Sequence, residues 1–407
     1  MRAGRPRRTP RGPAFPPIRI PLPFPRSFPF PLPRSVTVRL TPRDATWLAA
    51  AGLLILLGLW LITTRGPGSP PRPSPPAPAV SADGYLFCTW NAENLFDDVD
   101  DPANHDADED WFAAHPEVVR EKADRLAQAL RLQNGGRGPD VLVVVEVETR
   151  RAAELLRDAL NDGLAPADHY TTLVHRDNRT GRRIEPAVLS RLPARDDLTR
   201  TFHADRTLEA HLVGPGGEPL VVLASHWTSR LRGETQGRRA SYGDNLYRAA
   251  VELTASDPAA DVLIAGDFND EPGDPSVVDH LHALADADRV LDTSRTGGPL
   301  VLLDLTARLD PTRGEGTYFY GGRWQVFDHV VAAPGLLDPA GWRVLPETLR
   351  VENPVELRTG RDGRPWRFGG PNAVNPRGYS DHFAVTVRLV ARTTDGQPGT
   401  TPADPGP

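Results

Sequence analysis

Short runs of β-forming residues, spread over most of the chain, constrain its fold most strongly. Segments rich in Val, Leu and aromatic residues predict strands. The predicted strands are Tyr85–Trp90, Val141–Val147, Ala187–Ser190, Leu220–Ser225, Val262–Ala265, Gln325–Val331 and Phe383–Leu389. Apolar residues recur every three or four positions in Pro116–Arg131 and Asn245–Leu253, which predicts helices. The sequence therefore predicts an α/β fold, and without a repeat of about 20 to 50 residues it does not resemble a solenoid or propeller.

The N-terminal part of the chain differs in composition from the rest. Residues 1–44 are rich in Pro and Arg and residues 65–82 are rich in Pro, so we expect a disordered tail and a semi-rigid linker. Residues 45–64 carry no charge and are almost wholly apolar. A helix of that length spans about 30 Å, which matches the hydrocarbon core of a bilayer. We therefore expect a transmembrane helix at 45–64, one folded domain at 83–392 and a disordered tail at 393–407.

The distribution of arginine predicts the orientation of this helix. The first 45 residues hold ten Arg and one Asp. Because positive charge favours the cytoplasmic side, we expect a single-pass membrane protein with its N-terminus in the cytoplasm and its folded domain outside. Secretion after signal cleavage is the alternative, although no clear cleavage site of small residues follows the apolar run.

Charge and cysteine content exclude several classes of protein. With +9 on the first 45 residues and a total of −6, the remainder of the chain carries −15, which argues against a protein that coats DNA non-specifically. The single cysteine, Cys88, rules out an intramolecular disulfide and any zinc or iron–sulfur site that needs two thiolates. Nothing in the sequence indicates a protein partner.

Polar side chains follow, interrupt or directly precede the apolar runs at several places. They are Asn91, Glu146, His226, Asp267, Asn269, Asp328, Asp381 and His382. Each alone has a structural explanation, such as a turn or a buried histidine. Strand ends in a stacked sheet can meet at one rim, however, and together these positions predict one functional cluster.

The residue types indicate the chemistry of that cluster. Carboxylate and amide oxygens suit Mg²⁺, Mn²⁺ or Ca²⁺ and suit zinc poorly. His226 and His382 titrate near neutrality and are able to bind or protonate phosphate oxygens, and Asp328 is suited to stabilise an imidazolium. A divalent cation, two histidines and several carboxylates are what attack of water on phosphorus requires.

Six segments in order resemble the motifs of the DNase I-like endonuclease/exonuclease/phosphatase superfamily. They are TWNAENLFD (89–97), VVVEVE (143–148), ASHWTSR (224–230), AGDFNDEP (265–272), VFDHVV (326–331) and YSDHF (379–383). Single motifs are short, but all six in the family's order span nearly the whole domain. The chain therefore resembles a bacterial-type, membrane-anchored member of this superfamily.

The resemblance implies a four-layer α/β sandwich, with two central, mainly antiparallel sheets flanked by helices. It implies that Asn91 and Glu146 bind Mg²⁺ or Mn²⁺, with Asp381 as a further acidic contributor. Asp267 would orient or deprotonate the attacking water, and Asn269 would hold a phosphate oxygen. His382, paired with Asp328, and His226 would be the two catalytic histidines.

The substrate is less constrained by the sequence. By the resemblance, Arg183 is a candidate for contacting a substrate phosphate, and a solvated arginine in a turn is the alternative. We expect a metal-dependent endonuclease or exonuclease that hydrolyses nucleic acid. A phosphodiesterase or phosphatase acting on a phospholipid or a small molecule is the enzymatic alternative, and a non-catalytic binding module is the third.

Overall fold

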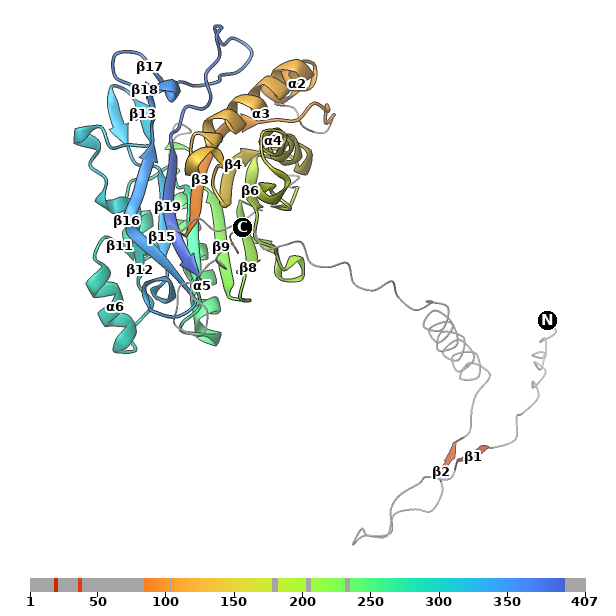
Figure 1. Cartoon of the computed structure of the whole chain (residues 1–407). Coiled ribbons are helices and arrows are strands. Elements are labelled where there is room, and N and C mark those ends of the chain that lie inside the picture. Colours follow the sequence, from red (N-terminus) through yellow and green to blue (C-terminus); the bar gives the residue numbers. More distant parts are fainter. Residues whose placement is uncertain are drawn as a thin grey trace, which may run out of the picture. The chain divides into compact units, whose positions relative to one another are not determined.

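The computed structural model describes residues 18–20, 36–38 and 84–391, except 103, 105, 178–181, 203–205 and 231–234 (Figure 1). The chain divides into two compact units at Pro75 and Pro76. In the first unit, β1 (Ile18–Ile20) pairs antiparallel with β2 (Val36–Val38). The predicted transmembrane segment, residues 45–64, lies outside the described residues. Among the residues that are described, no helix is long and apolar enough to cross a membrane.

Two large mixed sheets form the centre of the second unit, within the part of the chain that the structure describes. The first has six strands, and only its β3–β4 pair is parallel. In sheet order these are β16 (Trp342–Glu352), β19 (Ala384–Ala391), β3 (Tyr85–Leu95), β4 (Val141–Val147), β6 (Glu185–Ser190) and β5 (Thr172–His175).

The second sheet has seven strands in the described residues, and two of its pairs, β11–β12 and β10–β9, are parallel. In sheet order these are β11 (Ala283–Leu284), β12 (Leu302–Asp304), β15 (Asp328–Ala332), β10 (Val262–Asp267), β9 (Pro219–His226), β8 (Thr207–Val213) and β7 (Arg200–Phe202).

Helices and two small hairpins complete the unit. Within the described residues, the α-helices of this unit are α2 (Ala107–Ala113), α3 (Pro116–Arg131), α4 (Arg150–Asp162), α5 (Gln236–Ser256) and α6 (Ala287–Arg295), with the π-helical turn η5 (Ser276–His280) and several short 3₁₀ turns between the elements. The hairpins pair β13 (Tyr318–Tyr320) with β14 (Arg323–Gln325) and β17 (Arg358–Thr359) with β18 (Arg364–Pro365).

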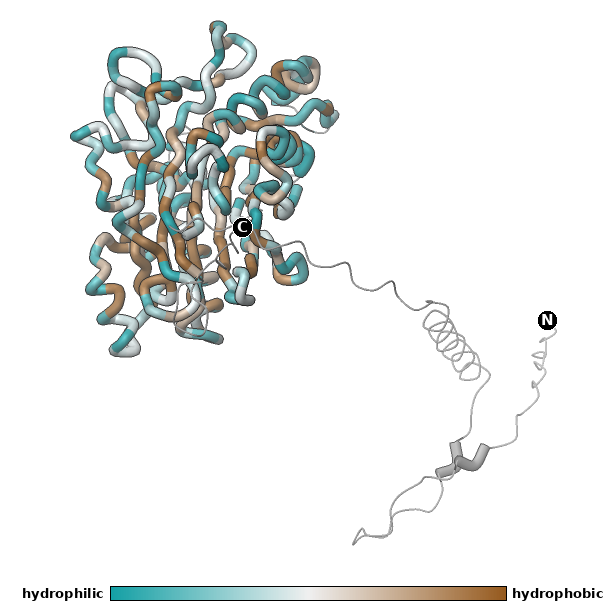
Figure 2. Tube along the Cα trace, in the orientation of Figure 1, coloured by the Kyte–Doolittle hydropathy of each residue, from teal (hydrophilic) through white to brown (hydrophobic). Residues whose placement is uncertain are grey.

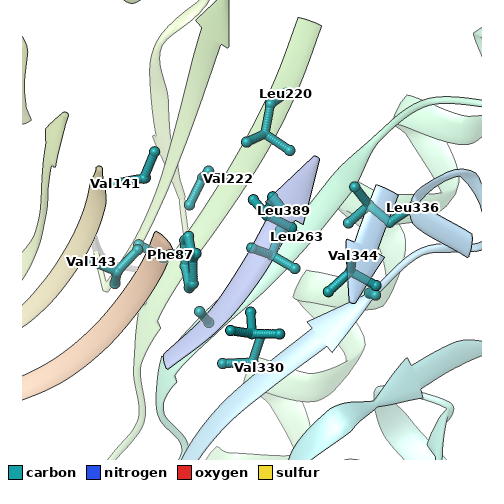
Figure 3. Close-up of a cluster of buried hydrophobic side chains, with 14 of the residues drawn as sticks. Phe87, Val141, Val143, Leu220, Val222, Leu263, Val330, Leu336, Val344 and Leu389 are labelled. Atoms are coloured by element: carbon teal, nitrogen blue, oxygen red, sulfur yellow. The ribbon is translucent and has the colours of Figure 1, made fainter. Parts of the chain in front are cut away.

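Three apolar cores define four layers. One core lies between the two sheets, where side chains such as Phe87 and Val143 meet Leu263 and Val330 (Figure 3). The second core joins the outer face of the six-stranded sheet to α3 and α4, and the third joins the outer face of the seven-stranded sheet to α5 and η5. Figure 2 shows the corresponding pattern, with hydrophobic strands at the centre and more hydrophilic helices outside. The predicted α/β arrangement of two sheets flanked by helices is confirmed.

Strand β4 shows why its sequence reads as an unbroken apolar run. Val141, Val143 and Val145 point into the core between the sheets, whereas Leu142 and Val144 point into the core beneath α3 and α4. Because both faces are buried, the strand needs no alternating polar residues. The run ends at Glu146, where the chain reaches the rim of the sheet.

One predicted strand is wrong because it combines parts of two separate strands. The segment Gln325–Val331 is divided between two sheets, because β14 ends at Gln325 and β15 begins at Asp328. The hydroxyl of Thr317 accepts hydrogen bonds from the backbone N–H groups of Phe327 and Asp328 at 3.1 and 3.2 Å. These bonds occupy backbone donors at the point where the chain changes sheets, and a continuous apolar sequence does not reveal the break.

Candidate active site

The strand register brings three of the predicted residues into one row. Asp267 on β10 is the register partner of His226 on β9 and of Asp328 on β15. The preceding residue, Gly266, has φ of 142°, and a Cβ atom there would lie 1.9 Å from the carbonyl oxygen of Ser225. Glycine is therefore required for the two strands to approach closely enough to place this row.

The two sheets meet at the side chain of Asn91. Its Nδ2 donates to Oε1 of Glu146 at 3.2 Å and to Oδ2 of Asp267 at 3.0 Å. Asn91 and Glu146 belong to the six-stranded sheet and Asp267 belongs to the seven-stranded sheet. One amide group therefore connects the acidic residues of both sheets in a buried environment.

A left-handed turn after Asn91 orients the neighbouring acidic groups. Glu93 and Asn94 have φ values of 55° and 59°. The N–H of Glu93 donates to Oδ1 of Asn91 at 2.8 Å, and the N–H of Asn94 donates to Oε2 of Glu146 at 2.7 Å. Such a strained turn persists only where its surroundings hold it, which is common at functional sites.

Lys122, the single lysine of the chain, contacts the backbone of this turn. It is 1% exposed, lies near the rings of Phe112 and Phe368, and donates to the carbonyl oxygen of Glu93. That carbonyl and the N–H of Asn94 belong to the same peptide group. Lys122 therefore binds one end of a peptide whose other end donates to Glu146.

His382 forms the other side of the cluster. Its Nδ1 lies 2.7 Å from Oδ2 of Asp328, and its Nε2 lies 3.9 Å from Oδ2 of Asp267. Burial disfavours the imidazolium, but the carboxylates of Asp328 and Asp267 outweigh this effect and raise the pKa of His382 well above its ordinary 6.5. His382 is therefore charged at neutral pH.

His226 has the opposite charge state. Burial and the nearby guanidinium of Arg206 lower its pKa to about 3, so its ring is neutral. The Arg206 guanidinium donates to Nδ1 at 3.2 Å, which leaves the proton on Nε2. That atom lies 3.5 Å from Oε1 of Glu146 and 4.0 Å from Oδ2 of Asp267. The site therefore contains one neutral and one charged histidine.

Two acidic groups of the site bind protons more tightly than usual. Burial raises the pKa of Asp267 to about 7 against the opposing effect of His382. Burial and the nearby Glu93 and Glu146 raise the pKa of Asp381 to about 7 against His382 and the Arg367 guanidinium, 3.7 Å away. The positive charge around these carboxylates is thus insufficient to offset their burial.

These shifts predict how the metal-free fold responds to pH. Burial raises the pKa of several carboxyl groups, among them Asp261, Asp267 and Asp381, to about 7, and Glu148, to about 8. Between pH 6.5 and 8 these groups and His382 bind more protons in the folded than in the unfolded chain, so stability falls as pH rises. His226 and Lys122, whose pKa values burial lowers to about 3 and about 8, oppose this trend only at the two ends of the range, near pH 6.5 for His226 and near pH 8 for Lys122.

We therefore expect a lower melting temperature at pH 8 than at pH 6.5 in EDTA. Each excess proton changes the unfolding free energy by about 1.4 kcal/mol per pH unit. Asp261→Asn, directly before the start of β10 and thus at the opposite end of this strand from Asp267, should reduce the pH slope. A melting temperature that stays constant or rises over this range would contradict the assignment of protonated carboxyl groups.

Asn269 also lies at this rim. Its backbone N–H donates to Oδ1 of Asp267 at 2.8 Å, and its Nδ2 donates to the carbonyl oxygen of Trp227 at 3.1 Å. The Nδ2 group of Asn269 carries a second hydrogen, which is oriented by this bond and is able to donate to a substrate atom. The structure therefore brings all eight strand-end residues of the predicted cluster to the same rim.

The predicted phosphate-contacting arginine lies farther out. Arg183 forms an ion pair with Asp101 in the acidic segment 97–110. Its neighbour Arg182 donates to Oδ1 of Asn94 at 2.8 Å and to Oδ2 of Asp106 at 2.5 Å. Arg182 is thus hydrogen-bonded to the turn that orients Glu146. Part of the acidic segment is neutralised by these arginines, which the sequence alone did not reveal.

A comparison with models of protein families identifies the family of this chain. Residues 87–391 match the Endonuclease/Exonuclease/phosphatase family. The chain belongs to this family. Members of the endonuclease/exonuclease/phosphatase family hydrolyse phosphate esters, so the protein is a hydrolase of phosphodiester bonds. A search of curated proteins finds no match.

Solved structures that are similar to this chain include proteins from three organisms. Truncated TDP2 from Caenorhabditis elegans is 15% identical, with TM-score 0.45, over 76% of this chain and 97% of its own. Beta toxin from Staphylococcus aureus, with bound magnesium ions, is 12% identical, with TM-score 0.44, over 75% and 99%. A family protein from Bacteroides thetaiotaomicron is 14% identical, with TM-score 0.44, over 76% and 98%.

Proposed function

We propose that this family member is a divalent-metal-dependent nuclease that hydrolyses phosphodiester bonds of nucleic acid. The observation that carries the proposal is the placement of Asp267 between the neutral His226 and the charged His382, at 4.0 and 3.9 Å. The Asp267 carboxyl, with a pKa of about 7, has one histidine on each side of it. This arrangement suits an acid–base reaction at neutral pH.

The oxygen donors of the site fit Mg²⁺ or Mn²⁺. Asn91 and Glu146 are linked by a hydrogen bond, and Asp381 is close enough to Glu146 for its pKa to be raised by that residue. These residues would hold the ion, which when bound would neutralise charge on the reacting phosphate. A cation there would also supply the positive charge that these buried carboxylates lack.

The roles of the remaining residues follow from their protonation states. Asp267 orients the attacking water and accepts its proton. His226 donates from Nε2–H, and Asn269 donates its amide hydrogen, to the phosphate oxygens that gain charge. His382 donates its Nε2 proton towards the leaving oxygen, while Asp328 fixes the ring through Nδ1. Each step uses a proton at an identified atom.

Cleavage of supercoiled plasmid by the full chain in detergent tests the proposed function. We expect nicking with Mg²⁺ or Mn²⁺, none with EDTA, and none with Asp267→Asn. Asp279→Asn, which changes an acidic residue of η5, is the matched control and should retain activity. Cleavage that persists in EDTA, or a folded protein that cleaves no nucleic acid, would contradict the proposal.

The peptide bound by Lys122 leads to a prediction about metal affinity. Lys122→Met should let the Glu93–Asn94 peptide relax and loosen Glu146, which weakens Mg²⁺ binding roughly 10- to 100-fold, as expected for loss of an outer-shell partner. The melting temperature should change little, because relief of the buried ammonium offsets the lost hydrogen bond. Calorimetric titration with Mg²⁺, with Arg125→Met on the same helix as control, measures this. Tighter Mg²⁺ binding would instead show that the ammonium acts only by repulsion.

We also propose that residues 45–64 anchor the protein in a membrane, with the enzyme domain outside the cytoplasm. The support is the uncharged apolar run and the excess of Arg before it. The full chain should remain in the membrane fraction after carbonate extraction, and protease added outside the cells should cut the enzyme domain. Release of the intact full chain by carbonate would contradict the anchor, and a cleaved N-terminus in the medium would favour secretion.

A further inference from the structure

The hairpin β13–β14 stands beside His382. Its turn consists of Gly321 and Gly322, with φ values of 58° and 81°, which is the conformation that a tight two-residue hairpin requires. Trp324 stacks on Phe383 with ring centroids 5.8 Å apart, and the N–H of Phe383 donates to the carbonyl oxygen of Thr317 at 2.8 Å. The hairpin is therefore tied to the segment that carries His382.

The other face of the hairpin carries a series of aromatic rings. The ring centroid of Tyr318 lies 4.6 Å from that of His382, at an interplanar angle of 30°. The next ring on this face, Tyr320, lies 6.3 Å from Tyr318 and nearly parallel to it, at 9°. Phe327 supports Tyr318 from a centroid distance of 5.5 Å. The series thus begins at the proposed reaction centre and leads away from it.

The exposure of these rings increases along the series. His382 is 6% exposed, Tyr318 is half-buried, and Tyr320 is 55% exposed. Among the exposed large apolar side chains of the described residues, Tyr320 is the one aromatic; the others are Val or Leu. An exposed, rigidly held ring beside a reaction centre has a face available for a planar group.

We propose that Tyr318 and Tyr320 form a stacking subsite for a nucleobase next to the scissile phosphodiester bond. This inference rests on the proposed nuclease function and narrows its substrate to nucleic acid with an unpaired base at that position. Stacking of bases on aromatic side chains tolerates any base, because every base offers a π-face. The subsite would therefore favour single-stranded or frayed substrates without fixing their sequence.

Other ligands fit these rings less well. A quaternary ammonium headgroup is bound by aromatic rings placed around it, whereas these rings are arranged in series. An acyl chain would need a continuous apolar surface, and Arg323 beside the turn is exposed and charged.

The test compares Tyr320→Leu, which removes the ring, with Tyr320→Phe, which retains it. The substrates are a fluorescein-labelled oligothymidylate and the same strand with an abasic residue on either side of the cleaved bond. With the full chain in detergent and Mg²⁺, Tyr320→Leu should raise KM for oligothymidylate roughly tenfold and leave kcat unchanged. Tyr320→Phe should match the wild type, and one abasic substrate should be insensitive to Tyr320→Leu.

Equilibrium binding of the same strands, measured by anisotropy in EDTA, separates the two proposals. Binding that depends on the Tyr320 ring without any cleavage would support the subsite and overturn the nuclease function. Metal-dependent cleavage with equal KM in all three proteins on both kinds of substrate would overturn the subsite alone. Ring-dependent binding to phosphatidylcholine vesicles, with none to oligothymidylate, would also overturn the subsite.

Discussion

His382→Gln should lower kcat for phosphodiester hydrolysis by about 10²- to 10⁴-fold, the range typical for loss of a general acid. Glutamine retains a hydrogen-bonding side chain but has no titratable proton to give to the leaving oxygen. KM should change little, because other groups bind the substrate. Rates under substrate saturation with Mg²⁺ measure the effect.

Two further variants show whether the charge of His382 is responsible. Asp328→Asn removes the carboxylate that raises the pKa of His382, so the alkaline limb of the pH–rate profile should move to lower pH. His280→Gln changes a partly exposed histidine paired with Asp244 and should leave kcat unaltered. Full activity of His382→Gln would show that another group protonates the leaving oxygen.

Glu146→Gln should abolish Mg²⁺ binding at millimolar concentrations and hydrolysis with it. Loss of outer-shell partners alone costs roughly 10- to 100-fold, and loss of a charged ligand should cost more. Gln keeps the shape of the side chain, and its amide oxygen is still able to accept the hydrogen bond from Asn94, so the fold should persist. Calorimetric titration with Mg²⁺ or Mn²⁺ measures the affinity directly.

The control for this variant is Glu121→Gln on helix α3, where the side chain is 40% exposed and pairs with Arg125. It should bind Mg²⁺ like the wild type. Because the pKa of Asp381 is raised partly by Glu146, Glu146→Gln should also lower the pKa of Asp381 and flatten the loss of stability at alkaline pH in EDTA. Unchanged Mg²⁺ affinity in Glu146→Gln would place the metal elsewhere.

The sequence predicted the parts of the structure whose pattern is local. Helix α3 was predicted with its observed bounds, because one face of Pro116–Arg131 is apolar at helical spacing and is buried. Strand β4 was likewise predicted with its observed bounds. Helix α5 begins at Gln236, nine residues before the predicted Asn245, because its first half has little apolar periodicity.

The strand-end residues were found because each follows, interrupts or precedes an apolar run, so their position in the sequence is enough to predict a shared rim. Other residues that contact the site were not found. Arg206, Lys122 and Tyr318 reach the site from elements distant in sequence, and none has a pattern that distinguishes it from an ordinary surface or core residue. The burial of Lys122 beside Glu93 depends on tertiary packing.

Hydrolysis of a DNA oligonucleotide in ¹⁸O-labelled water tests the central claim most directly. If water attacks phosphorus at the Asp267 site, mass spectrometry will find one ¹⁸O atom in the terminal phosphate of the product, with Mg²⁺ or Mn²⁺ and not with EDTA or Asp267→Asn. Label in the released hydroxyl, or cleavage products without label, would show that another bond is broken and contradict the account.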